Sequence, residues 1–436
     1  MAYSAFIGTP RTVRDERFLR FLTFWILMGA ALYQLALCFV HTHLFPMRTS
    51  IVALSEFVLY AACLLIVARR VQIEFIAVLA LIAAYLFFMA LVRNALDFKG
   101  FRDILIIVLF YWLGRTMGSM EMGDRILKIL IALVLLFGFF ELFFLNQYSR
   151  VFNVFSYYVN QGGLAGATNW AGGSLALNGM RPEGIGRTIL PGLLGNHRVS
   201  SIFLEPVSLG NFSVIIAAWG LAKPREQWRQ MLFYLTMSAI MITLADSRYG
   251  MLTVGCLVVM RMIFAGRAHK LAILLPAICV AMLLGIAVFV NGDHADNILG
   301  RLYLTGATLM RFGPKEILGF NGYNFNFGDM GYAVVLTRFG LLFFTAAWIG
   351  FWLIRMQDER GERFRSYVAL YASLILSVSG TSLFALKTAG ILWFLVGCCA
   401  LHQRQRAPAE TQAPATAPRH AALPRSSRDG KVGYAH

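Results

Sequence analysis

A few charged residues stand out in this sequence because their types suit phosphate binding and proton transfer. Arg198 and Glu205 lie in the segment RVSSIFLEPVSLGNF, which covers residues 198–212. Arginine holds phosphate oxygens bidentately through a rigid, permanently charged fork, and a positioned carboxylate can act as a general base. We therefore interpret Arg198 as a phosphate or pyrophosphate ligand and Glu205 as a candidate catalytic base. The structural alternative is that Glu205, followed by Pro206, only starts a helix at its positive dipole end.

Further arginines lie where they could contact the same anion. Arg248 ends the short connection Asp246-Ser247-Arg248 between two apolar blocks, and Arg338 lies inside a later block, where a guanidinium must face the protein interior or a wet cavity. Arg187 and Arg311 lie in the two longest loops. We assign all four to substrate binding. The alternatives are contacts with lipid phosphates and, for Arg248, a salt bridge to Asp246 that closes the hairpin.

Asparagine and aromatic residues come together in the segment GFNGYNFNFGDMGY, which covers residues 319–332. Aromatic rings stack on the C–H faces of sugars and amides bond to hydroxyls, so we include Tyr332 among the residues that bind a glycan. The same mixture also forms an ordinary aromatic belt at a membrane interface. Neither a Gly-rich phosphate loop nor an Asp-x-Asp metal pair stands out in the sequence, and we expect no metal site and no cofactor.

The composition limits which elements can position these residues. Of the 436 residues, 58% are hydrophobic and 14% are charged, whereas soluble domains have about 45–50% apolar and about 25% charged residues. This excludes a cytosolic enzyme. Lysine and arginine exceed the acidic residues by 39 to 22, a net charge of +17, which we attribute to anionic lipid and membrane topology. The sequence has no nucleic-acid motif, and we expect no nucleic-acid partner.

Apolar blocks of membrane-spanning size run through most of the chain. In hydrocarbon every backbone polar group needs an internal partner, and blocks of about 20 residues have the length of helices. We therefore predict an all-α, polytopic integral membrane protein with about twelve transmembrane helices. The fourth block is short before Arg115, so it is either a span or an interfacial helix. The blocks cover residues 21–40, 51–68, 73–92, 103–120, 126–146, 203–222, 230–245, 249–265, 271–291, 331–354, 366–386 and 388–402.

Loop charge predicts which side of the membrane each segment occupies. With both ends in the cytoplasm, every inner loop is basic, as the positive-inside rule requires. The chain then divides into a cytoplasmic segment at 1–20, a transmembrane domain at 21–402 and a disordered, Pro-rich cytoplasmic tail at 403–436. Two long loops, at about 147–202 and 292–330, lie on the outer side, and long loops often carry function. All six cysteines lie in apolar blocks, which predicts no disulfide.

Three of these segments together resemble the bacterial superfamily of O-antigen and exopolysaccharide polymerases and O-antigen ligases. The segments are Arg198–Phe212, Asp246–Gly250 and Gly319–Leu342, and their order and the outer loops around them agree with the family. The resemblance implies a metal-independent inverting glycosyltransferase of GT-C-like architecture. It also implies a location in the bacterial inner membrane with the active site facing the periplasm, and arginines that hold the pyrophosphate of an undecaprenyl-linked glycan.

One departure from the family pattern bears on the reaction. O-antigen ligases typically carry a His in the last segment between outer loop and helix, and the aligned positions here are Asp329, Met330 and Gly340. The resemblance therefore favours an exopolysaccharide polymerase, which moves a growing glycan from its lipid pyrophosphate onto the next lipid-linked repeat unit. Either Glu205 or Asp329 could accept the proton of the acceptor hydroxyl, as the base of an inverting glycosidase does.

Two other functions stay open at the level of sequence. An O-antigen ligase shares the fold and transfers the polymer to the lipid A-core. A flippase or other transporter of lipid-linked oligosaccharide fits twelve helices equally well, although transporters usually show internal repeats and polar residues at the midplane. The expected partners are undecaprenyl-pyrophosphate-linked glycans as donor and acceptor, membrane lipids, and flippase and chain-length or export proteins.

Overall fold

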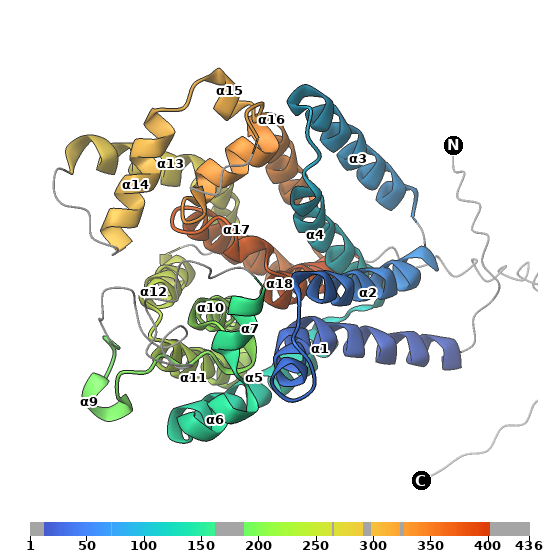
Figure 1. The fold of residues 1–436 in the computed structure, drawn as a ribbon. Helices are drawn as coiled ribbons and strands as arrows, with labels where there is room; N and C mark the ends of the chain where they lie inside the picture. The colour runs from blue at the N-terminus through green and yellow to red at the C-terminus, as the bar shows by residue number, and fades with distance from the viewer. Residues whose placement is uncertain are drawn as a thin grey trace, which may run out of the picture. The chain divides into compact units, whose positions relative to one another are not determined.

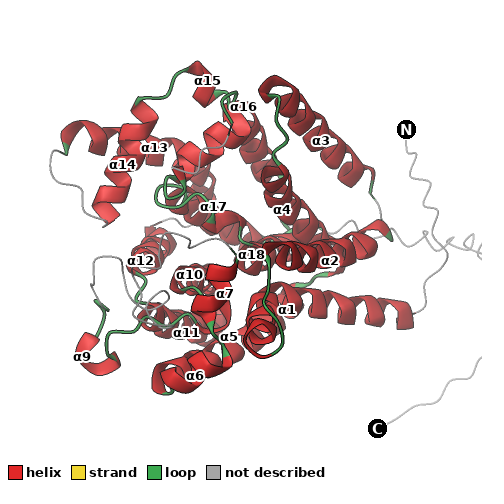
Figure 2. Cartoon of the chain, in the orientation of Figure 1, coloured by secondary structure: helices red, strands yellow, loops and turns green. Residues whose placement is uncertain are grey.

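Helices provide nearly all of the regular structure (Figure 1, Figure 2). The computed structural model describes residues 13–70, 72–161, 187–263, 266–290, 298–322 and 327–401. These residues contain no β-strand, and one isolated bridge joins Met356 to Ala400. The predicted all-α class is therefore confirmed. The predicted tail at 403–436 and residues 162–186 of the first long loop lie outside the described residues.

Six helices of the described chain are long and apolar enough to cross a membrane. This agrees with the predicted membrane protein, because runs of about 20 apolar residues match the thickness of the hydrocarbon core. Four of the six match predicted blocks within two residues at each end: α2, α3, the run through α13, and α16. The six are α1 (Val13–His43), α2 (Thr49–Ala68), α3 (Ile73–Arg93), α5 (Met120–Phe143), the run His269–Phe289 through η4 (Gly266–Leu274) and α13 (Leu275–Phe289), and α16 (Gly331–Leu353).

The other helices are shorter or more polar, and α10 is the most deeply buried of them. Every residue of α10 except Val207 is buried, because this helix is apolar around its whole circumference. It packs against α11, α12, α17 and α18. The full set of shorter or more polar helices comprises α4 (Phe98–Met117), α6 (Leu145–Val151), α7 (Val154–Asn160), α9 (Pro191–Leu194), α10 (Pro206–Ala222), α11 (Trp228–Ala245), α12 (Arg248–Ile263), α14 (Ile298–Met310), α15 (Pro314–Ile317), α17 (Glu359–Ile375) and α18 (Leu386–Cys399), with short 3₁₀ turns η2 (Ser201–Phe203), η3 (Arg225–Gln227) and η6 (Ser382–Phe384).

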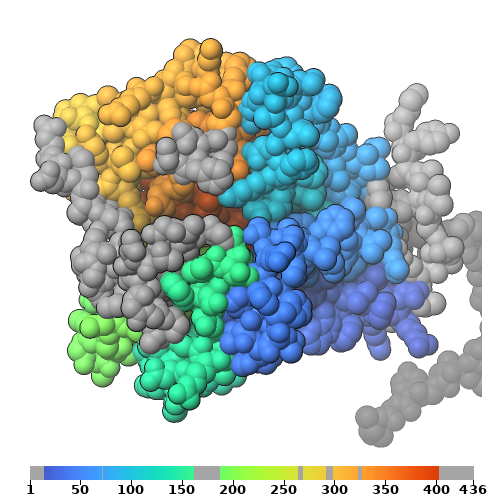
Figure 3. Space-filling view, viewed as in Figure 1, coloured from blue at the N-terminus to red at the C-terminus, as the bar shows by residue number. Residues whose placement is uncertain are grey.

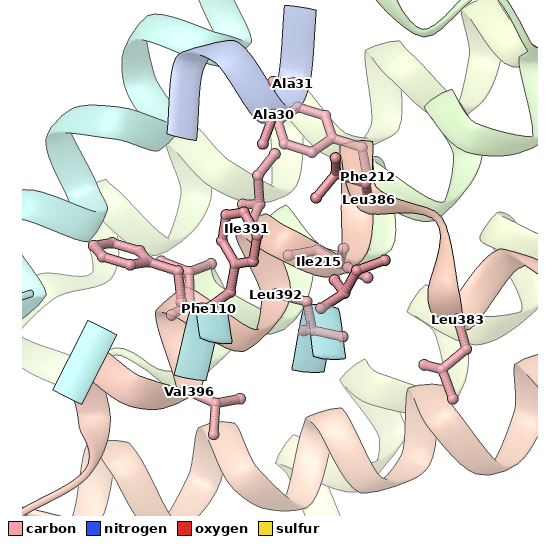
Figure 4. Packing of buried hydrophobic residues seen from close by; sticks show 14 of the residues in the cluster. Ala30, Ala31, Phe110, Phe212, Ile215, Leu383, Leu386, Ile391, Leu392 and Val396 are labelled. Carbon is pink, nitrogen blue, oxygen red and sulfur yellow. The ribbon is translucent and has the colours of Figure 1, made fainter. Parts of the chain in front are cut away.

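The fourth predicted block forms helix α4, which packs closely against α18. A Cβ atom on Gly114 would lie 2.1 Å from the carbonyl oxygen of Phe394, and one on Gly397 would lie 2.2 Å from that of Tyr111. Glycine is therefore required at both positions, since small residues let helices in membranes approach each other. Figure 4 shows Phe110 of α4 in the same core as Ile391 of α18 and residues of α10.

Helix α16 is broken in its first half. Gly340 has φ +76°, and a Cβ atom there would lie 2.4 Å from the carbonyl oxygen of Leu318. Side chains of α3 bind the carbonyls around the break: the Tyr85 hydroxyl donates to Phe339 at 2.6 Å, and Arg93 donates to Arg338 at 2.7 Å. A broken helix is tolerated at membrane depth when other groups satisfy its backbone in this way.

Helix α3 is the least enclosed of the long helices. Only Phe75 and Met89 among its residues are buried, while apolar side chains such as Leu81, Phe87 and Leu91 are exposed. In Figure 3 the light-blue surface of this region adjoins the orange surface of α15 and α16. An apolar helix with so much exposed apolar surface is suited to face lipid, because lipid tails do not penalise it.

Candidate active site at the start of helix α10

Glu205 lies directly before α10, between a 3₁₀ turn and the helix. The turn η2 is followed by Leu204, which has φ +57°, and Glu205 is extended before Pro206 takes the first helical position. The predicted helix start is therefore correct. The Glu205 side chain does not accept a hydrogen bond from a backbone N–H of the helix, so its carboxylate remains available to other side chains.

Lys387, at the start of α18, is the main partner of this carboxylate. Its Nζ atom donates to Glu205 Oε2 at 2.8 Å, to the Phe203 carbonyl at 2.8 Å and to Gln34 Oε1 at 2.9 Å. The Lys387 side chain is only 3% exposed, whereas that of Glu205 is 44% exposed. The ammonium is thus buried with all three of its N–H donors used, and the Glu205 side chain beside it is half exposed.

Two hydroxyl groups complete the surroundings of the Glu205 carboxylate. Ser208 donates to Oε2 at 2.8 Å, and Tyr158 of α7 donates to Oε1 at 3.2 Å. Burial raises the pKa of Glu205, but the Lys387 charge and these hydrogen bonds lower it more, so the net pKa lies below its ordinary value. We call Glu205, Lys387, Tyr158, Ser208 and Gln34 the Glu205 cluster.

A run of hydrogen bonds leads from the Glu205 cluster into the neighbouring helices. Gln34 Nε2 donates to the Tyr33 hydroxyl at 3.2 Å, and Tyr33 donates to Glu56 Oε1 of α2 at 2.8 Å. Arg102 of α4 donates to the other Glu56 oxygen at 3.2 Å. Residues far apart in sequence are therefore joined side chain to side chain, as buried polar groups require.

The same run ends at the predicted site residue Arg338. Arg102 also binds Asp103 at 2.8 Å, and Arg338 Nη1 binds the second Asp103 oxygen at 3.2 Å. Arg338 Nε binds Asp97 at 2.7 Å, and the Arg338 side chain is 3% exposed. The structure thus connects Glu205 to Arg338, and the Arg338 guanidinium is occupied by two carboxylates.

Arg187 and Arg198 meet at the C-terminal end of α11. Arg187 donates to the carbonyls of Thr243, Leu244 and His197, and Arg198 Nε donates to the Ala245 carbonyl at 3.2 Å. Positive groups are favourable there because the last carbonyls of a helix have no partner within the helix. Arg187 is buried, and its donors serve the backbone, whereas Arg198 is half buried.

The hairpin Asp246–Arg248 follows the same helix end and lies against α10. Asp246 has φ +50° and accepts hydrogen bonds from the backbone and hydroxyl of Thr188 and from the backbone of Ile189. A Cβ atom on Gly210 would lie 2.3 Å from the Ser247 hydroxyl, so this glycine allows the hairpin to approach α10. Two of the three motif segments are therefore in contact, and Arg248 begins α12 beside them with a half-buried side chain.

The remaining predicted residues lie apart from these contacts. Tyr332 is buried, and its hydroxyl donates to the Ser373 carbonyl of α17 at 3.0 Å. Arg311 is exposed beyond the end of α14. The Asp329 side chain is 68% exposed and lies 4.0 Å from Arg301. Among the described residues, Asp329 pairs with Arg301, and no hydrogen bond or ion pair joins it to the Glu205 cluster.

Sequence reasoning missed several residues of the site. Lys387 separates two predicted apolar blocks, which is the same signal that drew attention to Arg248. Glu141 of α5 was also missed: its carboxylate is 1% exposed and accepts from His197 Nε2 at 2.8 Å and from the backbone N–H of Ser201 at 2.6 Å. Glu141 thereby positions the chain just before Glu205, and its place inside an apolar block was the available signal.

Metal binding and similarity to known proteins add no further site. Within the described ranges, no group of three or more His, Cys, Asp or Glu side chains is arranged to hold a metal ion. Comparisons of this chain with family models, curated proteins and solved structures find no match. The site is therefore described by this chain's own contacts, which unite Arg198, the hairpin and the Glu205 cluster around the start of α10.

Proposed function

We propose that this protein is a membrane glycosyltransferase that polymerises polyprenyl-pyrophosphate-linked repeat units into a surface polysaccharide or exopolysaccharide. One observation carries the proposal. Glu205, with its half-exposed side chain, lies directly before α10, and the hairpin that leads to Arg248 packs on Gly210 in the first turns of the same helix. The segments that carry the proposed anion-binding arginine and the proposed proton acceptor are thus in contact, which supports glycosyl transfer from a pyrophosphate.

The reaction follows from these roles. The acceptor hydroxyl oxygen attacks the anomeric carbon of the donor glycan, and the bond from that carbon to the pyrophosphate oxygen breaks. Glu205 takes the hydroxyl proton, and Arg198 and Arg248 neutralise the charge that develops on the departing polyprenyl pyrophosphate. Attack from the face opposite the leaving group inverts the anomeric centre. Asp329 is the alternative proton acceptor, and Arg311 and Tyr332 are further proposed contacts for the glycan.

The proposal includes about twelve spans with the active site on the periplasmic side of the inner membrane. Polar contacts support this arrangement because they join segments that the loop-charge pattern assigns to one side. Arg70 binds Glu16 at 2.6 Å, and both are expected inside, whereas His41 lies 3.0 Å from Ser156, and both are expected outside. Reporter fusions at residues 175 and 310 should be external and a fusion at residue 225 internal; an internal signal from residue 175 would refute the topology.

Deletion of the gene tests the function in cells. A polymerase deletion should leave single repeat units on the lipid carrier, visible as loss of high-molecular-weight glycan on a gel. A ligase deletion would leave polymer on its lipid, and a flippase deletion would leave no external units. Restoration of the polymer by the wild-type gene is the control, and continued synthesis of full-length polymer in the deletion strain would refute the polymerase.

A lipid-linked oligosaccharide transporter is the second candidate, and the break in α16 favours it. Transporters often use discontinuous helices near their substrate sites, and α16 is interrupted at Gly340, next to the ion-paired Arg338. In proteoliposomes a transporter moves lipid-linked glycan between leaflets without lengthening it, whereas the proposed polymerase lengthens it. The size of the product therefore separates the two candidates.

A further inference from the structure

We propose that Lys387 is the positioning residue for Glu205: it holds one carboxylate oxygen in place, so that the other oxygen can receive the acceptor proton. This inference rests on the proposed function, and it adds a residue from α18 to a site otherwise built from the segments around α10. Lys387 does not touch the substrate in this proposal. It acts through Glu205.

The geometry around the ammonium supports a positioning role. Lys387 Nζ binds the Phe203 carbonyl and Glu205 Oε2, both at 2.8 Å, and these two residues flank Leu204 with its positive φ. A single ammonium therefore holds both sides of the turn that delivers the carboxylate. The third bond, to Gln34 of α1 at 2.9 Å, fixes the lysine itself. An ammonium has three donors, so none is left for a substrate.

The two oxygens of Glu205 have different surroundings. Oε2 receives both Lys387 and Ser208 at 2.8 Å, while Oε1 receives only the longer bond from Tyr158 at 3.2 Å. The side chain is 44% exposed despite its buried partner. The carboxylate is thus held mainly at Oε2 and keeps more hydrogen-bonding capacity at Oε1, which is the arrangement that a general base needs to bind an acceptor hydroxyl.

The charged and titratable groups facing Glu205 come from three elements. Lys387 lies on α18, Tyr157 and Tyr158 lie on α7, and Tyr33 on α1 interacts electrostatically with Tyr158. Burial and the nearby Glu205 carboxylate raise the pKa of Tyr158 well above its ordinary value, so its phenol stays neutral over the working pH range. Lys387 is therefore the cation that keeps the Glu205 carboxylate ionised, and its removal should make the carboxylate easier to protonate.

A matched pair at the other end of α10 provides the control. Lys223 follows the last residue of the helix, its side chain is fully buried, and its Nζ binds Asp124 at 2.8 Å. The two lysines thus share burial, distance and type of partner, and the proposal gives a role in catalysis to Lys387 only. If Lys387 had only a structural role, removal of Lys387 and removal of Lys223 should both lower stability and leave the pH profile of elongation unchanged.

The test measures elongation against pH with purified protein in vesicles, with lipid-linked glycan isolated from the host cells as the probe. We compare wild type, Lys387→Met, Lys387→Gln and Lys223→Met, each normalised to folded protein by size-exclusion chromatography. Loss of Lys387 should reduce elongation by about tenfold or more across the pH range, because the carboxylate is no longer held in place. It should also move the acid limb of the profile upward by about one pH unit or more, because the charge that favours ionisation is gone. Lys223→Met should lower yield and thermal stability without moving the limb.

The outcomes separate the inference from the proposed function. If wild type elongates the glycan and the Lys387 variants keep its pH limb, the positioning role is overturned while the polymerase stands. If wild type does not elongate the glycan, both are overturned. If neither Lys387 variant folds, the wild-type profile decides: the inference requires its acid limb to lie below about pH 4.3, the ordinary glutamate value, and a limb at or above that value refutes it.

Discussion

The two ends of helix α10 carry similar ion pairs with different surroundings. At the N-terminal end Glu205 binds Lys387, and at the C-terminal end Lys223 binds Asp124, with both N–O distances at 2.8 Å. The signs suit the helix dipole, because the helix's own acid lies at its positive end and its own lysine at its negative end. Each lysine is almost completely buried. Both pairs also join distant parts of the chain.

The carboxylates of the two pairs differ in what else they bind. Asp124 also accepts from Trp219 Nε1 at 2.7 Å and from the Tyr234 hydroxyl at 2.8 Å, and Arg360 lies 3.6 Å away. Its side chain is 19% exposed, against 44% for Glu205. The Asp124 pair is enclosed by its partners and stabilises the fold, whereas the Glu205 pair keeps one side open. Similar chemistry can thus serve architecture at one end of a helix and be available for reaction at the other.

The largest effect is expected when each carboxylate is neutralised. Glu205→Gln should lower elongation by about 10²–10⁴-fold per folded molecule, because that is the usual contribution of a general base. Asp124→Asn removes the partner charge of a buried lysine, so it should lower the thermal midpoint and leave elongation per folded molecule close to wild type. Purified variants and lipid-linked glycan give both quantities. Equal loss of elongation in both variants would remove the functional distinction between the ends.

The next effect concerns arginines at helix ends. Arg198→Lys and Arg248→Lys should each lower elongation by about 10²-fold, because lysine keeps the charge and loses the bidentate fork. Arg261 is the matched control: its guanidinium binds the Lys223 carbonyl at 3.1 Å at the other end of α10. Arg261→Lys should elongate normally in the same assay. Near-normal polymer from Arg198→Lys and Arg248→Lys would identify them as lipid or backbone anchors.

A smaller effect is expected at the break in α16. This break lies next to Arg338, where the run of hydrogen bonds from the Glu205 cluster ends. Gly340→Ala places a Cβ atom at φ +76° and against the Leu318 carbonyl, so it should destabilise the protein by about 1–3 kcal/mol. Gly255→Ala in α12 is the control, since a Cβ atom there meets nothing within 4 Å. Thermal unfolding in detergent measures both. An unchanged midpoint for Gly340→Ala would show that the break is not required.

The smallest effect is expected at Asp329. Its side chain is 68% exposed, and its ion-pair partner among the described residues is Arg301, at 4.0 Å. Asp329→Asn should therefore keep elongation within about threefold of wild type if Glu205 is the base, since a weak exposed pair contributes little. The measurement is the same vesicle assay. A loss as large as that of Glu205→Gln would transfer the role of base to Asp329 and leave the Glu205 pair structural.

The helices themselves could be predicted from the sequence with good accuracy. Apolar runs of membrane-spanning length specify helices locally, since each backbone group must find its partner within the same segment in hydrocarbon. The blocks at 73–92 and 331–354 accordingly agree with α3 and α16 to within one residue. The start of α10 at Pro206 was also readable, because proline is favoured in the first helical turn and a carboxylate is favoured before it.

Other features depended on the tertiary structure. The sequence marked Glu205 and Arg338 as polar groups in an apolar setting, but only the packing of α1, α2, α4 and α18 connects them through side chains. The break at Gly340 could not be predicted from the sequence either, because the apolar run continues across it. The side chains that bind the free backbone carbonyls at the break lie on α3.

The sequence by itself therefore determined the class of protein and the ends of many helices, because burial in lipid acts on each segment separately. The tertiary structure decided which charges meet. Lys387 pairs with Glu205, and Lys223 pairs with Asp124, across long separations in the chain. Such pairing depends on distance and desolvation after the helices have packed, and residue type alone does not specify either one.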